Sequence, residues 1–366
     1  MSMMLSCNKP NIKETDLFRL ERQYKTGDLG QGNIVKDLEK TFTVYCNKYY
    51  ASAYSSATSA FEAILKYLNI GPRDEVILSP LTFKSIPYSV IRSGAKPVFI
   101  DTNDSYLPDW SQLNQLITYK TKLIVTTSLY GLPDNNFKNI NQNIWTCEDN
   151  SQSIGAKYKD GKNIGSSLNT DFSIFSFYAT KNITGCEGGV IVHNQDTDFF
   201  DLYKNNGIVE NIDNQIILGT NLRMTDINAT LILSQFDRLD HITKHRNNQA
   251  KIYHNILNIE NKQYKYISEN TIHAFHQYTV ELPENIDRIS FVDSLKQKSI
   301  YLGIYYDYLT NYDYKLKRVI EFQETPNALD QSDRCVSLPI GMNLSHKDIE
   351  YIAKTFNTYL DRSINE

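Results

Sequence analysis

A lysine stands between an apolar run and a glycine pair in the stretch FSFYATKNITGCEGGV, residues 175–190. Buried surroundings favour the neutral form of a lysine amine, and a neutral amine is a nucleophile toward aldehydes. Lys181, at the end of an expected buried strand, therefore suits a Schiff base with an aldehyde. The alternative is a lysine whose ammonium group simply extends into solvent.

Two further polar residues lie at the end of the expected strand NIWTCED, residues 143–149, and just beyond it. Asp149 ends that run, and a carboxylate beside the pyridine nitrogen of pyridoxal phosphate keeps the nitrogen protonated, so that the ring can accept electrons. Gln152 follows three residues later and could reach the ring hydroxyl. Acids are common at strand ends, so Asp149 taken alone fits a structural role equally well.

Small hydroxyl residues precede an amphipathic run in SSATSAFEAIL, residues 55–65. Free backbone N–H groups at the start of a helix, together with Ser or Thr hydroxyls, can bind a phosphate group. Ser176, on the strand before Lys181, would be a further phosphate ligand. The alternative is an ordinary Ser or Thr cap at the N-terminus of the helix.

Metal and disulfide chemistry have little support. His241 and His245 have a spacing that can hold a metal ion, but no acid or cysteine with matching spacing accompanies them, and KHRNNQ is typical of a solvated helix face. The five cysteines are scattered without a C-x-x-C pair: Cys7, Cys46, Cys147, Cys186 and Cys335. We therefore expect no metal site and a reducing compartment.

Short apolar runs alternate with helix-like segments through roughly the first 200 residues. This alternation is typical of an α/β fold with a mainly parallel central sheet covered by helices on both faces. Ligands of such sheets lie at the C-terminal ends of the strands, where Asp149 and Lys181 fall. The expected strands are 75–80, 95–101, 122–131, 143–149, 171–177 and 188–193, and 58–70 has helical spacing.

The pattern changes after about residue 225, where a long amphipathic stretch predicts one or two long helices. Beyond it we expect strands at 273–282 and 335–340 and helices at 289–300 and 346–360. This order predicts two domains, a large one over residues 1–250 and a smaller C-terminal α/β domain over residues 251–366.

The composition of the chain limits the kinds of molecule that it is expected to bind. The 366 residues are 41% hydrophobic and 22% charged, with a formal net charge of -4, which gives no reason to expect binding to nucleic acid or an anionic membrane. No apolar run approaches the roughly 18 residues that a membrane helix needs, and the N-terminus turns polar without the apolar core of a signal peptide. We expect a cytoplasmic protein.

Several short motifs occur in a characteristic order. They are SAT before a helix, GPRDEVI, TF, Gly-Ala-x-Pro-Val-Phe-x-Asp, Glu-Asp-x-x-Gln, Phe-Ser-Phe-x-x-x-Lys, Glu-Gly-Gly and Asn-x-Arg-Met. In this order the chain resembles the DegT/StrS-type sugar-nucleotide aminotransferases, which are fold-type-I pyridoxal-phosphate enzymes. It is most similar to the branch that makes 4-amino-4,6-dideoxy sugars, such as the pseudaminic-acid pathway transaminase. The resemblance extends from GQGNIVKDLEK (30–40) to the last helix.

The resemblance implies roles for individual residues. Lys181 would bind the cofactor covalently and later shuttle a proton, Asp149 would pair with the pyridine nitrogen, and Gln152 would contact the ring oxygen. The remaining cofactor contacts would be the phosphate ligands Ala57, Thr58 and Ser176, the ring-stacking Phe83, and Asn221 reaching the phosphate from the other subunit. A homodimer with two shared sites follows.

The departures from the family pattern lie in segments expected near the sugar. Ser128 stands where many relatives have histidine, and Lys84 stands where a small apolar residue is usual. Tyr305 and Tyr308 stand where the closest relatives have histidine and proline. The expected substrate contacts are Lys84, Ser128, Tyr178, Tyr305 and Tyr306.

These features predict an aminotransferase that moves an amino group to a nucleotide-linked 4-keto-6-deoxy sugar for surface-polysaccharide or other glycan synthesis. The resemblance implies that glutamate is the amino donor. Amination of a 3-keto sugar uses the same residues and stays open. A non-catalytic pyridoxal-phosphate sensor or scaffold is a third hypothesis, whereas Lys181 counts against the deoxygenating branch, which has histidine there. A nicotinamide dehydrogenase is excluded because no G-x-G-x-x-G follows an early strand.

Overall fold

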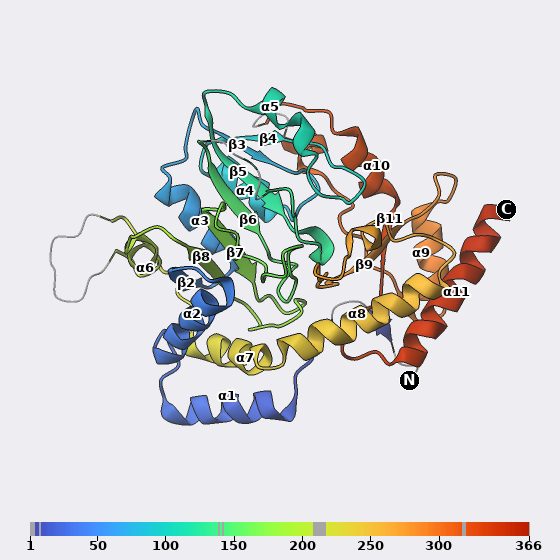
Figure 1. Ribbon diagram of the computed structural model, residues 1–366, viewed down its shortest axis with the longest axis horizontal. Helices are drawn as coiled ribbons and strands as arrows, with labels where there is room; N and C mark the ends of the chain where they lie inside the picture. Colours follow the sequence, from blue (N-terminus) through green and yellow to red (C-terminus); the bar gives the residue numbers. More distant parts are fainter. Residues whose placement is uncertain are drawn as a thin grey trace.

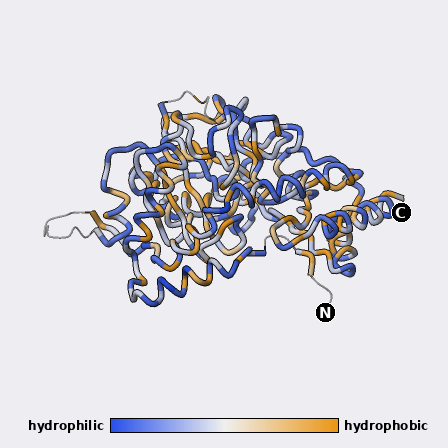
Figure 2. Tube along the Cα trace, turned by 60° about the horizontal axis from the view of Figure 1, so that its bottom comes forward, coloured by the Kyte–Doolittle hydropathy of each residue, from blue (hydrophilic) through white to orange (hydrophobic). Residues whose placement is uncertain are grey.

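The computed structural model describes residues 4–6, 9–137, 140, 143–207, 217–316 and 320–365. A central sheet lies among helices, and one long helix leads away from it to a second group of elements beside the C-terminus (Figure 1). Hydrophobic segments gather inside the molecule, while the outer helices carry many hydrophilic residues (Figure 2). The expected α/β fold with a mainly parallel sheet is confirmed.

The central sheet has seven strands in the order β2-β8-β7-β6-β5-β3-β4. Strands β4, β3, β5, β6 and β7 are parallel to one another, whereas β8 is antiparallel to both of its neighbours. A parallel order brings the carboxyl ends of β6 and β7 to one edge of the sheet. The strands are β2 (Tyr50–Tyr54), β3 (Glu75–Leu78), β4 (Lys96–Phe99), β5 (Thr121–Thr127), β6 (Trp145–Asp149), β7 (Phe172–Ser176) and β8 (Gly189–His193).

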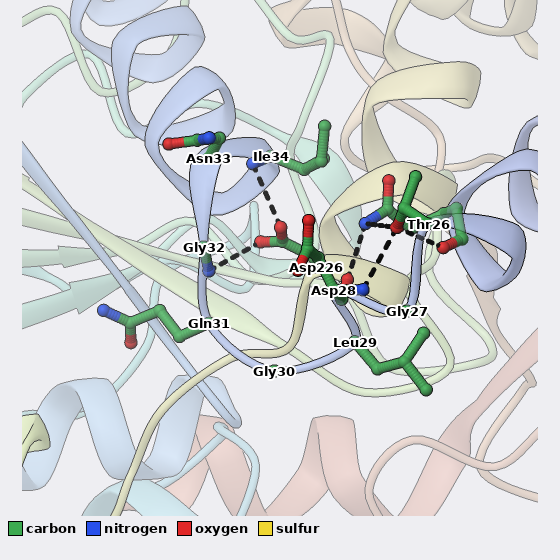
Figure 3. A pocket seen from close by; sticks show the side chains of 11 residues that line it. Thr26, Gly27, Asp28, Leu29, Gly30, Gln31, Gly32, Asn33, Ile34 and Asp226 are labelled. Carbon is green, nitrogen blue, oxygen red and sulfur yellow. Dashed lines mark hydrogen bonds between the residues drawn. The ribbon is translucent and has the colours of Figure 1, made fainter.

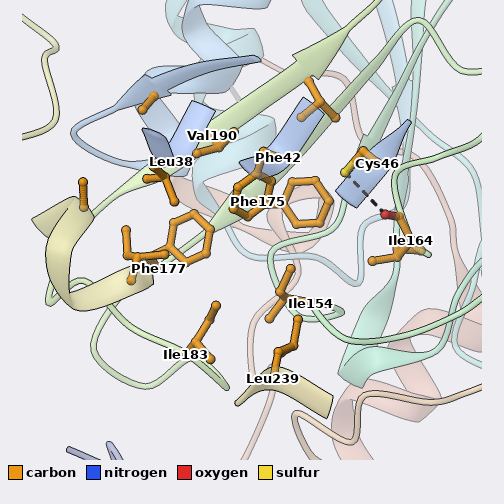
Figure 4. Close-up of a cluster of buried hydrophobic side chains, with 14 of the residues drawn as sticks. Leu38, Phe42, Cys46, Ile154, Ile164, Phe175, Phe177, Ile183, Val190 and Leu239 are labelled. Carbon is orange, nitrogen blue, oxygen red and sulfur yellow. Dashed lines mark hydrogen bonds between the residues drawn. The ribbon is translucent and has the colours of Figure 1, made fainter. Parts of the chain in front are cut away.

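Helices cover both faces of this sheet. Successive side chains of a strand point to opposite faces, so Phe172 and Ile174 of β7 pack with α3, while Phe175 packs with α2. On the α2 face, Phe42 lies 5.2 Å from Phe175 and 5.5 Å from Phe177, centroid to centroid (Figure 4). The covering helices are α3 (Ala57–Tyr67), α4 (Ser85–Arg92) and α6 (Phe199–Lys204) on one face, and α2 (Asn33–Cys46) and α7 (Asp226–Phe236), with α1 (Glu14–Thr26) outside α7, on the other.

The C-terminal elements have a hydrophobic cluster of their own, which begins at Ala250 and also includes Leu5. Strands β9 and β11 pair antiparallel, and β1 (Leu5–Ser6) pairs with β10. The elements are α8 (Leu239–Ile256), β9 (Tyr278–Glu281), α9 (Arg288–Lys296), β10 (Ile300–Tyr301), α10 (Pro326–Arg334), β11 (Cys335–Leu338) and α11 (His346–Asn365). Short helical segments are η1 (Trp110–Gln112), α5 (Leu113–Leu116), η2 (Leu129–Gly131), η4 (Tyr264–Tyr266), η5 (Thr310–Tyr312) and η6 (Tyr314–Leu316).

Specific polar contacts join the two groups of elements. Asp101, just beyond β4, accepts hydrogen bonds from the backbone N–H groups of Asn327 (3.0 Å) and Ala328 (2.9 Å) in the first turn of α10. These are N–H groups that a helix leaves without an internal partner, so the carboxylate both caps α10 and attaches it to the sheet. The division at residue 250 stays a prediction.

Two sequence-based boundaries need correction. Within the expected strand at 273–282 only Tyr278–Glu281 is extended in a sheet, because residues 273–277 instead form a loop that packs on Gly131 and Asn182. The strand before the lysine ends at Ser176, so Lys181 lies in a loop rather than at the strand end. Strand β2 was not among the expected strands.

Candidate active site

A closed loop between β7 and β8 presents Lys181. The N–H of Phe177 donates to the carbonyl of Gly188, and the N–H of Gly185 donates to the carbonyl of Phe177, each at 2.9 Å. From α7, the Gln235 amide donates to the carbonyl of Thr184 at 2.6 Å and accepts from the Thr184 N–H at 3.2 Å. The loop is therefore fixed at its base, and Lys181 stands at its far end.

The amine of Lys181 is held in surroundings that favour its neutral form. Burial lowers the pKa of Lys181 to about 8, although the negative charge of Asp149 partly opposes the shift. Asp149 ends β6 and is 3% exposed, and burial raises the pKa of its carboxyl group. The two residues thus lie within electrostatic range of each other, and near pH 8 a large fraction of the amine is available as a nucleophile.

The residue after the lysine is held from the C-terminal half of the chain. Asn182 donates its Nδ2 proton to the carbonyl of Ala274 at 2.9 Å, which leaves Oδ1 as an acceptor 3.3 Å from Nδ1 of His276. His276 must therefore carry its proton on Nδ1. Burial, with the charges of Lys181 and Arg246, holds the pKa of His276 well below its usual range, so the imidazole beside the lysine loop is neutral.

The N-terminus of α3 lies against the glycine pair that follows the lysine loop. A Cβ atom added to Gly189 would come within 2.4 Å of the backbone nitrogen of Ala57, so only glycine lets β8 approach the helix this closely. Ser176 is the cross-strand partner of Gly189 and therefore lies beside the same helix end. Ser56 acts as the expected N-cap, with its hydroxyl accepting from the N–H of Ser59 at 3.1 Å.

This arrangement fits a phosphate group. The first-turn N–H groups of a helix, including those of Ala57 and Thr58, have no partner within the helix and carry the positive end of the helix dipole. Ser176 adds a hydroxyl from the neighbouring strand. The capping and phosphate-binding interpretations of SSATSAF are therefore compatible, because Ser56 performs the first and leaves Ala57 and Thr58 for the second.

An aromatic and amide group lies next to Asp149. Gln152 accepts the backbone N–H of Tyr130 on Oε1 at 2.8 Å and donates from Nε2 to the hydroxyl of Tyr306 at 2.8 Å. The ring of Tyr306 lies 6.1 Å from that of Phe83, which is 50% exposed. Burial and the charge of Asp149 raise the pKa of the Tyr306 hydroxyl. Phe83, Gln152, Tyr306 and Asp149 thus form one group.

The other expected substrate contacts differ in exposure. Lys84 is exposed and Tyr178 is 49% exposed, so both are accessible beside Phe83 and Lys181. Ser128 is only 1% exposed, and its hydroxyl donates to Asn150 at 2.9 Å. Tyr305 is partly buried, and its carbonyl accepts from the hydroxyl of Tyr130. The roles of these residues in binding a sugar stay predictions.

Asn221 is exposed on the segment before α7, and this segment lies beside the start of α3, because the N–H of Ser55 donates to the carbonyl of Leu222 at 2.8 Å. The same segment is joined to the N-terminal motif GQGN by Asp226, whose carboxylate accepts from the N–H groups of Gly32 (2.9 Å), Val35 (3.0 Å) and Ile34 (3.3 Å). Asp226, Gly32 and Ile34 border a pocket of ≈ 580 Å³ (Figure 3). The role of Asn221 in a partner's site stays a prediction.

Sequence reasoning did not identify Asn182, His276 or Asp226. Asn182 could have been noticed because it directly follows the lysine, and Asp226 because it stands in the first turn of an expected helix. Nothing in the order of residues indicates that His276 reaches Asn182.

Two further features were sought in the part of the chain that the structure describes: clusters of metal-ligating side chains and helices that could span a membrane. No group of three or more His, Cys, Asp or Glu side chains there could hold a metal ion, and His245 is hydrogen-bonded to Gln249 at 2.9 Å. None of the described helices is long and apolar enough to cross a membrane.

A model of the DegT/DnrJ/EryC1/StrS aminotransferase family matches residues 10–357. The chain belongs to this family. The family is pyridoxal-phosphate-dependent, so the chain is a transaminase whose cofactor is pyridoxal phosphate, and the resemblance seen in the sequence motifs is confirmed.

Individual relatives agree with this assignment. GDP-perosamine synthase of Escherichia coli O157:H7 is 30% identical over 341 residues, which cover 90% of this chain and 91% of that protein. Among solved structures, Helicobacter pylori PseC, an aminotransferase involved in the biosynthesis of pseudoaminic acid, has a TM-score of 0.90 at 22% identity, covering 98% of this chain and 100% of PseC. Spr1654 of Streptococcus pneumoniae, in its PLP-form, has a TM-score of 0.89 at 24% identity, covering 99% and 100%. The two structures show that the fold is shared.

Proposed function

We propose that this aminotransferase transfers an amino group from glutamate to a nucleotide-linked 4-keto-6-deoxy sugar, for surface-polysaccharide or related glycan synthesis. The observation that carries the proposal is the placement of a lysine with a pKa of about 8 within electrostatic range of a buried carboxylate, on a loop whose following glycine pair packs against a helix N-terminus suited to phosphate. The three parts match the amine, the anion and the phosphate site that pyridoxal phosphate requires.

Each residue has a proposed task. Lys181 would bind the cofactor as a neutral amine and would act as the base that accepts and returns a substrate proton. Asp149 would keep the ring nitrogen protonated, and the first turn of α3 at Ala57 and Thr58, with Ser176, would hold the phosphate. Phe83 would cover one face of the ring. Once bound, pyridoxal phosphate supplies a conjugated ring that accepts the electrons released when the proton leaves.

The sugar assignment is supported by relatedness. The relative at 30% identity is named as a GDP-perosamine synthase, and a structure sharing the fold is titled as an enzyme of pseudoaminic acid biosynthesis. The exposed Lys84 and Tyr178 and the partly buried Tyr305 and Tyr306 are proposed to contact the nucleotide sugar. Amination at C3 would use the same lysine and the same amine, so it is the competing assignment.

The assembly proposed is a homodimer in the cytoplasm. Asn221 is exposed on a segment that Asp226 holds to the N-terminal loop, which suits a residue that reaches the phosphate bound by a partner subunit. We also keep the division into residues 1–250 and 251–366 as part of the proposal, supported by the separate hydrophobic cluster of the C-terminal elements.

The function is tested in two half-reactions. Adding glutamate to the cofactor-loaded protein is expected to convert the absorbance of the pyridoxal form into that of the pyridoxamine form. The pyridoxamine form is then offered dTDP-, GDP- and UDP-linked 3-keto and 4-keto sugars, and mass spectrometry and NMR identify the aminated product and carbon. Loss of colour with no aminated sugar from any member of the panel would contradict the substrate class, whereas a protein that keeps its colour with glutamate would be the sensor or scaffold.

A further inference from the structure

The hydroxyl group of Tyr306 accepts a hydrogen bond but does not donate one to any residue that the structure describes. Gln152 accepts the backbone N–H of Tyr130 on Oε1, which fixes the orientation of the amide and makes Nε2 the atom that faces Tyr306 at 2.8 Å. Since Nε2 is a donor, the Tyr306 oxygen accepts, and its own proton remains to be donated elsewhere. No acceptor for that proton is found among the residues that the structure describes.

The surroundings of this hydroxyl place it beside the ring of the cofactor. The Tyr306 ring lies 6.1 Å from the ring of Phe83, and the charge of Asp149 acts on the hydroxyl. Phe83 is the residue proposed to cover the ring and Asp149 the one proposed to pair with its nitrogen. The region bordered by both residues is where an aromatic cofactor with an anionic ring oxygen would present an acceptor.

The position of Tyr306 is fixed by other parts of the fold. Its carbonyl accepts from the hydroxyl of Ser332 in α10 at 2.6 Å, and the neighbouring Tyr305 carbonyl accepts from the hydroxyl of Tyr130. A hydroxyl held by an amide on one side and by its backbone on the other loses little freedom when it binds a ligand. Burial keeps it protonated, so it remains a donor across the working pH range.

We propose that Tyr306 donates its hydroxyl proton to the ring oxygen of pyridoxal phosphate, with Gln152 as the positioning residue that aims it. This inference rests on the proposed function, because it assumes that the cofactor ring lies between Phe83 and Asp149. It assigns a direct cofactor contact to the C-terminal half of the chain, in addition to the contact that Gln152 can make with its second amide proton.

The proposed hydrogen bond would lower the pKa of the nitrogen that joins the cofactor to Lys181. The visible absorbance of the bound cofactor changes with pH as the nitrogen that joins it to Lys181 loses a proton. The ring oxygen then carries a less compensated negative charge, so a hydrogen bond to that oxygen stabilises the deprotonated form and lowers the pKa. Removing the donor must therefore raise the pH midpoint of the absorbance change.

The test is an absorbance titration of the cofactor-loaded Tyr306→Phe variant without any substrate. We expect the midpoint to rise by about one pH unit, the size of a hydrogen bond to a charged group. Gln152→Met removes the amide that orients the Tyr306 hydroxyl, and it is also expected to raise the pH midpoint. Tyr308→Phe is the matched control, because it removes a hydroxyl from the same segment, one that is bonded to Tyr88 at 3.0 Å and to Asp313, and its midpoint should not move.

The outcomes separate this inference from the function on which it rests. A Tyr306→Phe midpoint equal to that of the wild type overturns the inference, and so does a variant whose only change is a weaker response to glutamate or to the sugar. Should Tyr306→Phe fail to fold, Tyr306→Leu, which also lacks the hydroxyl, is titrated and judged by the same criterion. If the wild-type protein itself gives no pH-dependent cofactor absorbance, the proposed function fails.

Discussion

Two lysine–carboxylate pairs lie near the end of β6, and their surroundings differ. Glu148 is 1% exposed and accepts hydrogen bonds from the hydroxyls of Tyr158 (2.6 Å) and Ser173 (2.9 Å) and from the amide of Asn150 (3.2 Å). Its charge acts on Lys48, whose ammonium group donates to the carbonyls of Ser167 and Thr170. Every member of this first pair is engaged by protein groups.

Asp149 and Lys181 form the second pair, on the opposite face of the same strand. Within the described part of the chain, the carboxylate of Asp149 accepts hydrogen bonds only from Ser151, and the Lys181 amine has no hydrogen-bond partner. Burial raises the pKa of both carboxyl groups and lowers the pKa of both lysines. Burial and charge alone therefore do not distinguish the pairs. The difference is that the second pair keeps hydrogen-bonding capacity for a ligand, which we interpret as the mark of the functional pair.

Replacing each lysine in turn should give the largest difference between the two pairs. Lys181→Ala is expected to lower transaminase turnover by about 10⁴-fold, because both the covalent anchor and the proton-transferring base are lost, while the fold is retained. Lys48→Met should instead destabilise the protein and leave turnover per folded molecule within a few fold. Steady-state kinetics and thermal unfolding measure the two effects. Equal losses of turnover would show that the pairs are not different in kind.

Replacing the functional acid comes next in size. Asp149→Asn should lower turnover by about 10²–10³-fold, because the amide no longer keeps the ring nitrogen protonated. The apoprotein of this variant should be at least as stable as the wild type at pH 7, because a buried carboxylate with few hydrogen bonds has been removed. Unfolding by urea and single-turnover kinetics test the two statements, and an apoprotein that is clearly destabilised would contradict the second.

The structural acid should respond in the opposite way. Glu148→Met removes the oxygens that accept from the Tyr158 and Ser173 hydroxyls and the Asn150 amide, so we expect a loss of about 1–3 kcal/mol in the free energy of unfolding. The absorbance of the bound cofactor should stay as in the wild type. A normal stability together with an altered cofactor spectrum would reverse the roles assigned to the two carboxylates.

The smallest effect concerns pH. Burial lowers the pKa of Lys181 from 10.5 to about 8, so between these values the folded apoprotein holds fewer protons at Lys181 than the unfolded chain does. The free energy of unfolding therefore rises with pH across this window, and neutralising the residue removes a penalty that is complete below pH 8. Apo Lys181→Met should be more stable than the wild type by about 1–3 kcal/mol at pH 7, with the difference gone near pH 10.5. A difference independent of pH would contradict the assigned pKa.

Much of the fold follows from local patterns in the sequence. The apolar runs at β3, β4, β5, β6 and β7 and the helical spacing in α3 were enough to predict a mainly parallel sheet covered on both faces. Strand β2 has no comparable run, because YASAY gains its place by pairing with β8 rather than from its own hydrophobicity. Residues 273–277 have strand-like composition but form a loop, because their backbone is engaged by Gly131, Tyr130 and Asn182.

The part of the candidate site that could be predicted consists of residues in short sequence motifs. Lys181, Asp149 and the start of α3 belong to short motifs, and the structure brings the first two within electrostatic range. The hydrogen bond from Gln152 to Tyr306 and the contact between Asn182 and His276 join residues far apart in the chain. Such pairs depend on how the C-terminal elements dock onto the sheet, and no local pattern encodes that docking. The alternation of side chains along β6 likewise does not tell which of Glu148 and Asp149 faces the cofactor site.

The most direct measurement is borohydride reduction of the cofactor-loaded protein, followed by intact-mass determination and peptide mapping. We expect one phosphopyridoxyl group to become permanently attached to each chain at Lys181, with Lys48 unmodified. Attachment at any other lysine, or an unmodified Lys181 in protein that has taken up the cofactor, would contradict the assignment of Lys181 and Asp149 as the functional pair.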